Sequence, residues 1–216
     1  MQIEIDKPIL EYNQQLAEQN RMALSRENVL MINIMASPGA GKTSLILSTI
    51  ERLKDRYRIA VIEGDIASDV DAQLVKAQGV AAVQINTGGA CHLEAAMVAK
   101  ALDALDLHQT DLVIVENVGN LVCPVEFDLG ENLKVLILSI PEGDDKPLKY
   151  PSIFAEADAI LLNKIDAADF FDFDQKAFAD SVLRLNQSAP IFALSAKTGE
   201  GLDAWVGWLT DAAGAL

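Results

Sequence analysis

Cysteine and histidine are scarce in this sequence, with two of each among 216 residues. Two cysteines cannot build the disulfide framework of a small secreted protein, and we expect reduced thiols because nothing marks the chain for export. No run reaches the roughly 18 uninterrupted apolar residues that a membrane helix needs, and residues 1–21 lack the apolar segment of a signal peptide. These absences exclude secreted and membrane-spanning proteins and favour a cytoplasmic one.

Basic side chains are also few. The chain has 17 Lys and Arg against 32 Asp and Glu, which gives a net charge of −15. Such a charge repels nucleic-acid phosphates and anionic lipid, so we expect neither nucleic acid nor a membrane among the partners. It leaves room for one local cationic pocket that binds a nucleotide.

What the sequence does contain is a series of short apolar runs separated by helical patterns. The runs are rich in Val, Ile and Leu and do not alternate with polar residues, which is typical of strands buried on both faces of a parallel sheet. Alternating strands and helices predict an α/β fold with a mostly parallel sheet and helices on both faces. The expected strands are 29–36, 58–63, 80–86, 111–117, 133–140, 158–163 and 190–195.

A glycine-rich segment follows the first of these strands. Residues 36–43, ASPGAGKT, have the spacing of a P-loop with Ala36 in place of the first Gly, and a helical pattern follows. The backbone N–H groups of such a turn bind phosphate, while Lys42 adds a charge and Thr43 a hydroxyl for Mg²⁺. This motif makes the fold a three-layer P-loop NTPase fold. The residues expected to hold the phosphates are Pro38, Gly39, Ala40, Gly41, Lys42, Thr43 and Ser44.

Two later loops indicate which base is bound. Asp166, in the string NKID, offers a carboxylate that can accept both the ring N–H and the exocyclic amine of guanine, a donor pair that adenine lacks. The loop after the last expected strand is similar to the segment that completes the guanine pocket in GTPases. Together with the P-loop, these loops favour GTP over ATP. The expected base-binding residues are Asn163, Lys164, Asp166, Ser195, Ala196 and Lys197.

Acidic residues end two other strands. Asp65 follows the strand at 58–63, and Glu116 lies in the strand at 111–117. Hydrolysis needs a carboxylate on Mg²⁺, directly or through water, and a group that orients the attacking water. We expect Asp65, with Thr43, to hold Mg²⁺ and Glu116 to sense the γ-phosphate, with Lys42 completing the catalytic set. The sequence leaves the division of roles between the two carboxylates open.

The N-terminal part of the chain has a different pattern. Apolar residues in 4–27 recur at helical spacing among Glu, Gln and Arg. We therefore divide the chain into an N-terminal helical extension, 1–28, and a P-loop GTPase domain, 29–216. The helix either packs on the main domain, which we favour, or docks onto a partner.

Three of the four Cys and His residues lie in loops beside the switch segments. Cys91 and His92 follow the strand at 80–86, and Cys123 lies beyond Glu116. Thiolate and imidazole are the usual ligands of Zn²⁺ and also suit Ni²⁺. Buried free cysteines are common as well, and no CxxC spacing is present. The spacing alone leaves a metal site and structural thiols both open.

Several of these strings together resemble the HypB family, GTPases that help to insert nickel into [NiFe]-hydrogenase. The matching stretches lie between residues 37 and 166, in the family's order, and CHLEA and NVGNLVCP are far more specific than the general GTPase motifs. They are SPGAGKTSLI, VIEGDIASDVDA, VQINTGGACHLEA, VENVGNLVCPVEFDLGE, PEGDDKPLKYP and LLNKID.

The resemblance implies a slow GTPase of the SIMIBI class that acts as a metallochaperone. It implies a homodimer that depends on GTP or metal, with Cys91, His92 and Cys123 forming a nickel or zinc site at the interface. The implied cofactors are GTP or GDP, Mg²⁺, and Ni²⁺ or Zn²⁺. The implied partners are a second nickel accessory protein and the hydrogenase large subunit. The segment from Glu116 to Cys123 would then couple the γ-phosphate to metal affinity.

Two departures from the family pattern limit what is carried over. Residues 1–28 contain no Cys and no His, so we expect no nickel store or tight nickel site there. Ala96 stands where some members have a second His, one helical turn after the Cys-His pair. The number of metal ions at the site is therefore open.

Two other functions remain as alternatives. One is a related maturation GTPase for another metalloenzyme, such as urease, against which the CHLEA and LVCP strings argue. The other is a non-catalytic zinc-binding interaction module. Intact Lys42, Thr43, Asp65 and Asp166 argue against that second alternative.

Overall fold

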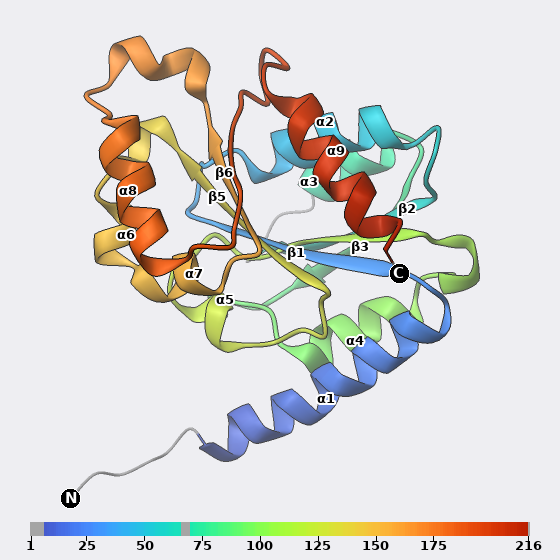
Figure 1. The fold of residues 1–216 in the computed structure, drawn as a ribbon. Coiled ribbons are helices and arrows are strands. Elements are labelled where there is room, and N and C mark those ends of the chain that lie inside the picture. The colour runs from blue at the N-terminus through green and yellow to red at the C-terminus, as the bar shows by residue number, and fades with distance from the viewer. Residues whose placement is uncertain (1–6, 66–69, 216) are drawn as a thin grey trace, which may run out of the picture.

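A seven-stranded sheet forms the centre of the computed structural model, which describes residues 7–65 and 70–215 (Figure 1). The strand order is β3-β2-β4-β1-β5-β6-β7, and every neighbouring pair is parallel. The predicted α/β fold is confirmed, with a sheet that is parallel throughout. The strands are β1 (Leu30–Ala36), β2 (Ile59–Asp65), β3 (Ala81–Asn86), β4 (Leu112–Glu116), β5 (Leu133–Ser139), β6 (Ala159–Asn163) and β7 (Ile191–Ala193).

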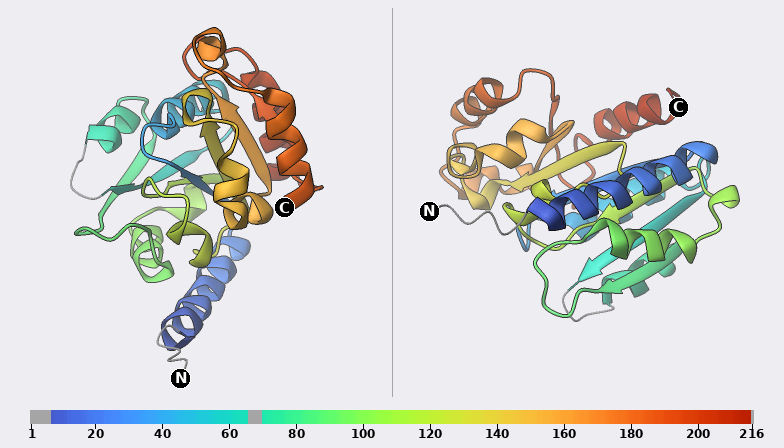
Figure 2. Two further views of the ribbon diagram at one scale, coloured as in Figure 1. Left: turned by 90° about the vertical axis from the view of Figure 1, so that its left-hand side faces the viewer. Right: turned by 90° about the horizontal axis from the view of Figure 1, so that it is seen from below.

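Helices cover both faces of this sheet, so the layers are three (Figures 1 and 2). One face packs against α2 (Lys42–Leu53), α3 (Val70–Lys76) and α9 (Leu202–Ala213). The remaining α-helices lie on the other face. These are α1 (Lys7–Arg26), α4 (Ala95–Asp103), α5 (Cys123–Glu126), α6 (Lys146–Lys149), α7 (Pro151–Glu156) and α8 (Gln175–Leu185), with 3₁₀ turns η1 (Leu107–Gln109), η2 (Ile140–Glu142) and η3 (Ile165–Phe170).

Strand burial follows position in the sheet. All seven residues of the central strand β1 are buried, and they alternate between the two cores: Ile32 and Ile34 face α2 and α9, while Met31 and Met35 face the opposite side. Strands β3 and β7 lie at the two edges and remain half-exposed. The expectation that every strand is buried on both faces is therefore wrong for these two, because an edge strand lacks a neighbour on one side.

The strand order places the candidate site. Strand β1 lies between β4 and β5. The chain leaves β1 toward β2 and leaves β4 toward β5, in opposite directions across the sheet. In open parallel sheets, ligands bind in the crevice at the carboxyl ends of the strands where the order reverses. The P-loop follows β1 at this point.

Helix α1 packs on the main body of the protein, beside α4. The side chain of Asn13 accepts a hydrogen bond from Ala95 N at 2.8 Å and donates to Asp128 O at 2.7 Å. The packed arrangement is thus confirmed for residues 7–26, while residues 1–6 lie outside the described part. The division into an extension, 1–28, and a domain, 29–216, stays a prediction. No helix of the described residues has the length and apolar character needed to cross a membrane.

Candidate nucleotide and metal site

The P-loop turns sharply because two glycines adopt left-handed backbone angles. Gly39 has φ of 76° and Gly41 has φ of 98°, a region that favours glycine. A Cβ on Gly41 would also lie 2.5 Å from Asn163 Nδ2, so glycine is needed there for space as well. Ala40 is fully buried beneath the turn. Helix α2 begins at Lys42, directly after this turn, as a phosphate-binding loop requires.

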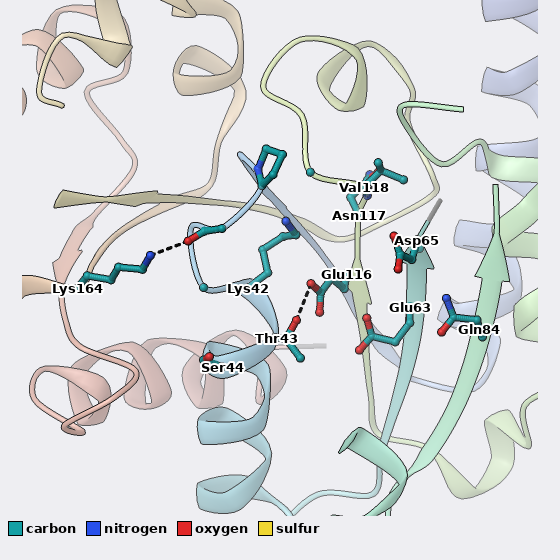
Figure 3. A pocket seen from close by; sticks show the side chains of 15 residues that line it. Lys42, Thr43, Ser44, Glu63, Asp65, Gln84, Glu116, Asn117, Val118 and Lys164 are labelled. Atoms are coloured by element: carbon teal, nitrogen blue, oxygen red, sulfur yellow. Dashed lines mark hydrogen bonds between the residues drawn. The ribbon is translucent and has the colours of Figure 1, made fainter. Parts of the chain in front are cut away.

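A cavity of 490 Å³ lies above this turn, at the carboxyl ends of β1, β2 and β4 (Figure 3). The structure brings most of the predicted phosphate and catalytic residues to its wall. Residues from β3 and from the loop after β4 complete it. The lining residues are Pro38, Gly39, Gly41, Lys42, Thr43, Ser44, Glu63, Gly64, Asp65, Gln84, Glu116, Asn117, Val118, Gly119 and Lys164.

Both predicted carboxylates reach this cavity. Thr43 Oγ1 donates a hydrogen bond to Glu116 Oε1 at 3.0 Å, and Asp65 lines the cavity from the end of β2. Oxygen ligands of this kind, a hydroxyl with carboxylates, are those that Mg²⁺ prefers. The side chains present therefore fit a magnesium ion, with Thr43, Asp65 and Glu116 as the residues that would hold it.

Sequence reasoning missed two further polar side chains in the cavity. Glu63 on β2 is 2% exposed and is paired in register with Gln84 on β3 and with Glu116 on β4. Three neighbouring strands thus carry a polar side chain at one level of the sheet, in the wall of the cavity (Figure 3). The sequence signal that could have predicted this is Glu63 itself, an acidic residue at the end of the apolar run 58–63. A Glu in a buried strand is unusual, because this residue type is almost never fully buried unless it is paired.

The two base loops lie together beside the P-loop. Asn163 Nδ2 donates to Ala40 O at 2.9 Å, and its Oδ1 accepts from Ala196 N at 3.1 Å, so this one amide connects three loops. Lys164 Nζ donates to Gly39 O at 2.6 Å. Ser195 Oγ donates to Asp166 Oδ1 at 2.6 Å, which orients the carboxylate. The exposed Lys197 follows in the same loop.

Cys91, His92 and Cys123 form one group of potential metal ligands. Their ligand atoms all lie within 4.8 Å of one another. Cys91 Sγ is 3.1 Å from Cys123 Sγ and 3.6 Å from His92 Nδ1. His92 Nε2 lies 3.8 Å from Glu94 Oε1, and the ring stacks on Phe127 at 3.9 Å. Two sulfurs and one imidazole nitrogen suit Zn²⁺ and Ni²⁺, and the donor set is one short of four.

Burial and hydrogen bonding shift the pKa values of two of these ligands, His92 and Cys123. Burial lowers the pKa of His92 although Glu94 and Glu126 oppose it, so the imidazole is neutral at pH 7, as a ligand must be. The hydrogen bond with Cys91, together with burial, raises the pKa of the Cys123 thiol. Binding a metal at these sulfurs therefore releases protons.

A short segment connects the metal group with the nucleotide cavity. Glu116, Asn117, Val118 and Gly119 line the cavity, and Cys123 follows at the start of α5. Asn120 Nδ2 donates to Cys91 O at 3.3 Å, so the same segment also contacts the other metal loop.

Comparison with known proteins agrees with this geometry. Residues 30–193 match the model of the CobW/HypB/UreG nucleotide-binding domain. The chain is 46% identical over 209 residues to the hydrogenase maturation factor HypB of Escherichia coli K12, which covers 97% of this chain and 71% of that protein.

Two solved structures are similar to the whole fold. HypB from Helicobacter pylori in complex with nickel has a TM-score of 0.89 at 39% identity, covering 94% of this chain and 95% of that one. The HypB of Archaeoglobus fulgidus has a TM-score of 0.88 at 40% identity, covering 94% and 99%. The P-loop, the two base loops and the Cys-His group are thus found in a chain that belongs to the HypB family of P-loop GTPases.

Proposed function

We propose that this protein is a GTP-hydrolysing metallochaperone that binds nickel at Cys91, His92 and Cys123 and assists nickel insertion into [NiFe]-hydrogenase. The observation that carries the proposal is the short segment from Glu116 to Cys123, which joins the nucleotide cavity to a metal ligand. A relative described as a hydrogenase maturation factor and a similar structure in complex with nickel support it.

Hydrolysis in this proposal uses the residues of the cavity. The N–H groups of the P-loop and Lys42 hold the β- and γ-phosphates and stabilise the charge that develops on them. Mg²⁺, when bound, neutralises phosphate charge. Asp65 and Glu116 lie where one carboxylate can hold the ion and the other can orient water. Turnover is slow, because no arginine reaches this cavity among the described residues.

The nucleotide state is passed to the metal through Glu116. Its carboxylate accepts from the Thr43 hydroxyl, a group placed beside the phosphates. The γ-phosphate alters this contact, and the segment from Glu116 to Cys123 then moves a sulfur ligand. Metal affinity differs between the GTP and GDP states, which is a coupling free energy between two sites. Hydrolysis thereby releases nickel to an acceptor.

The proposal also covers the metal site and the partners. Three ligand atoms per chain leave a four-coordinate ion incomplete, and a second copy of the chain supplies the rest in a homodimer. Zn²⁺ competes for such a Cys/His site. A second nickel accessory protein delivers the metal, and the hydrogenase large subunit receives it. This nickel transfer takes place in the cytoplasm.

The experiment that tests this function is a nickel titration with GDP and then with a non-hydrolysable GTP analogue. We expect nickel affinity to differ by about tenfold between the states, and Cys123→Ala to abolish the difference. His108→Ala is the matched control, because His108 is exposed and paired with Glu27, outside the metal group. Identical nickel binding in both states would refute the release mechanism.

A separate measurement tests the enzyme. GTP turnover should be lost in Lys42→Ala, because this side chain supplies the phosphate-binding charge. Unchanged turnover in that variant would contradict the assignment of the cavity.

A further inference from the structure

One buried amide lies between the nucleotide cavity and the Cys-His loop. Asn117 is fully buried. Its Oδ1 accepts from Val118 N at 2.9 Å and from Leu93 N at 3.2 Å. Val118 lines the nucleotide cavity, and Leu93 directly follows His92. A single oxygen therefore holds the backbone of both functional segments.

A second buried amide pairs with the nitrogen of Asn117 and holds it in place. Asn117 Nδ2 donates to Asn33 Oδ1 at 3.1 Å, and Asn33 Nδ2 donates to Glu131 Oε1 at 3.1 Å. Glu131 Oε2 accepts from Leu129 N at 2.7 Å. Because backbone N–H groups can only donate, Asn117 must present its carbonyl to Val118 N and Leu93 N, and its Nδ2 then points to Asn33. Asn33 presents its carbonyl to that nitrogen and its own Nδ2 to Glu131.

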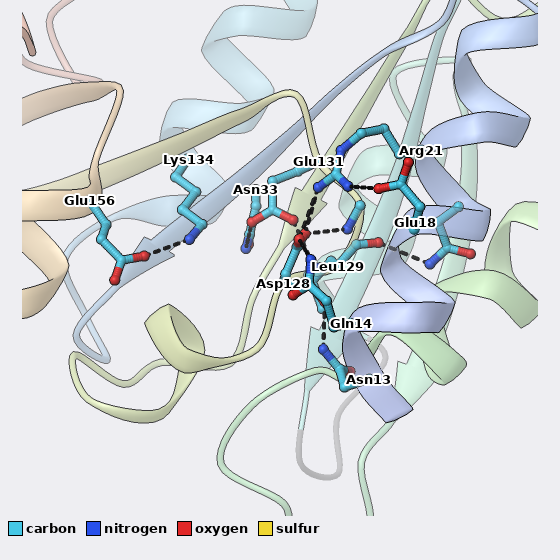
Figure 4. A network of polar contacts seen from close by, with 12 residues as sticks. Asn13, Gln14, Glu18, Arg21, Asn33, Asp128, Leu129, Glu131, Lys134 and Glu156 are labelled. Carbon is cyan, nitrogen blue, oxygen red and sulfur yellow. Dashed lines mark hydrogen bonds and ion pairs between the residues drawn. The ribbon is translucent and has the colours of Figure 1, made fainter. Parts of the chain in front are cut away.

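The chain of hydrogen bonds is buried and reaches helix α1. Asn33 is fully buried in the middle of β1, and Glu131 is 6% exposed. Leu129 lies close to Glu131 (Figure 4). Its carbonyl O accepts from Asn20 Nδ2 at 2.9 Å, and the same nitrogen donates to Ala95 O at the start of α4. Unpaired amides are costly in such a place, so this arrangement resists rotation of any one member.

We propose that Asn117 is a positioning residue that transmits the nucleotide state to Cys91 and His92, with Asn33 and Glu131 holding its amide in the required orientation. This proposal rests on the proposed function and names a second connection between its two sites. Movement of the segment from Glu116 to Cys123 changes the position of the Cys123 sulfur. The Asn117 oxygen carries movement of Val118 to Leu93, and so to the other two ligands.

Two connections are needed because the ligands come from two loops. Cys91 and Cys123 are 32 residues apart in the chain, and their sulfurs lie 3.1 Å apart. Moving one loop alone breaks the ligand set, whereas moving both changes its geometry in a concerted way. The close approach of Gly119 to the P-loop, where a Cβ would lie 2.9 Å from Pro38 Cγ, makes this segment sensitive to the phosphates.

The first test is Asn33→Leu, which changes neither the cavity wall nor a metal ligand. We expect GDP affinity to stay within about threefold of the wild type, while the ratio of nickel affinities between the two nucleotide states falls from about tenfold to about twofold. The control is Asn186→Leu. Asn186 is also buried, and its amide donates to the carbonyls of Phe154, Ala155 and Ala157 at the end of α7, outside the Asn117 network. It should lose stability but keep the ratio.

The second test needs no mutation. Hydrogen exchange at the Leu93 amide of the wild-type protein should change by about fivefold when a GTP analogue replaces GDP, because its acceptor on Asn117 moves. The Leu161 amide, inside β6, should not change. If Asn33→Leu fails to fold, this measurement on the wild type still tests the role of Asn117.

The outcomes separate the two proposals. If the wild type shows a nucleotide-dependent nickel affinity, but Asn33→Leu keeps the full ratio and Leu93 exchange does not change, the role of Asn117 is wrong and the proposed function stands. If the wild type shows no such dependence, the release mechanism and the role of Asn117 are both wrong.

Discussion

At the scale of single residues, we propose that the carboxylate of Asp166 selects guanine. The Ser195 hydroxyl donates to it at 2.6 Å, and the Ser195 oxygen in turn accepts from Thr198 N at 3.1 Å. The carboxylate is thus held in place before the base arrives. Its two oxygens can accept the two parallel N–H groups of guanine, whereas an amide at the same place offers one acceptor and one donor.

The variant Asp166→Asn should therefore bind GTP about a hundredfold more weakly, because a polar group of the base loses its partner. It should gain affinity for xanthosine triphosphate, whose carbonyl at the position of the exocyclic amine can accept from the new amide. Equilibrium binding of both nucleotides checks this. Asp169→Asn, an exposed change on the same 3₁₀ turn, is the control, and equal weakening by both variants would contradict the role of Asp166.

At the scale of elements, helix α1 is held by an ion pair as well as by amides. Arg21 donates to both oxygens of Asp128, at 3.0 and 2.9 Å. Burial acts to raise the pKa of Asp128, but hydrogen bonds from Gly130 N and Arg21 outweigh it and the pKa is lowered. A carboxyl whose folded pKa is lowered stabilises the protein above its unfolded pKa, and this contribution is lost as the pH falls through the folded value.

Replacing this carboxylate tests the contribution of the pair. Asp128→Asn should lower the free energy of unfolding by about 1 kcal/mol at neutral pH, since both partners are partly exposed. The difference from the wild type should shrink as the pH falls below about 4, where an unfolded Asp takes up its proton. Urea unfolding at several pH values measures this.

The control for that change is Asp180→Asn, which breaks an exposed pair with Lys176 within α8. It should leave the free energy of unfolding unchanged. A difference for Asp128→Asn that stays constant down to pH 2 would show that the ion pair does not hold the helix.

At the scale of the whole molecule, the net charge of −15 opposes the approach of a nucleotide anion. Lys42 and Lys164 provide local attraction in the cavity, but Glu63, Asp65 and Glu116 share the same walls. Long-range repulsion is screened by salt, while contacts inside the cavity are screened far less. Salt should therefore change the rate of association more than the strength of the final contacts.

We expect the association rate constant of magnesium-bound GDP to rise about threefold when ionic strength increases from about 10 mM to about 150 mM, where the screening length falls from about 30 Å to about 8 Å. Stopped-flow binding of a fluorescent GDP measures this. Uncharged guanosine should show no such rise. A rate that falls with salt would mean that the lysines of the cavity dominate the approach.

Most features that could be predicted from the sequence depend on residues close together in the chain. The turn of Gly39 and Gly41, the charge of Lys42 and the carboxylate of Asp166 each work within a few neighbouring residues, so the sequence shows them directly. The predicted strands lie within three residues of the observed ones, because apolar runs bounded by turns report burial. The half-exposed edge strands β3 and β7 were not predicted, because no single apolar run shows which strands lie at the edges of the sheet.

By itself, the sequence predicted the nucleotide-binding fold and favoured guanine, since both predictions rest on residue chemistry at short spacing. The three metal ligands were predicted from the resemblance to the HypB family, because spacing alone left them open. Only the tertiary structure decided that Cys91 and Cys123 meet, that Glu63 and Gln84 enter the cavity, and that Asn33 and Glu131 orient Asn117. These are contacts between strands and loops far apart in the chain. For the cavity and the metal group, the cause is the packing of the parallel sheet, which brings the carboxyl ends of its strands together at one end of the sheet. Asn33 and Glu131 lie near Asn117 because β1 is placed between β4 and β5.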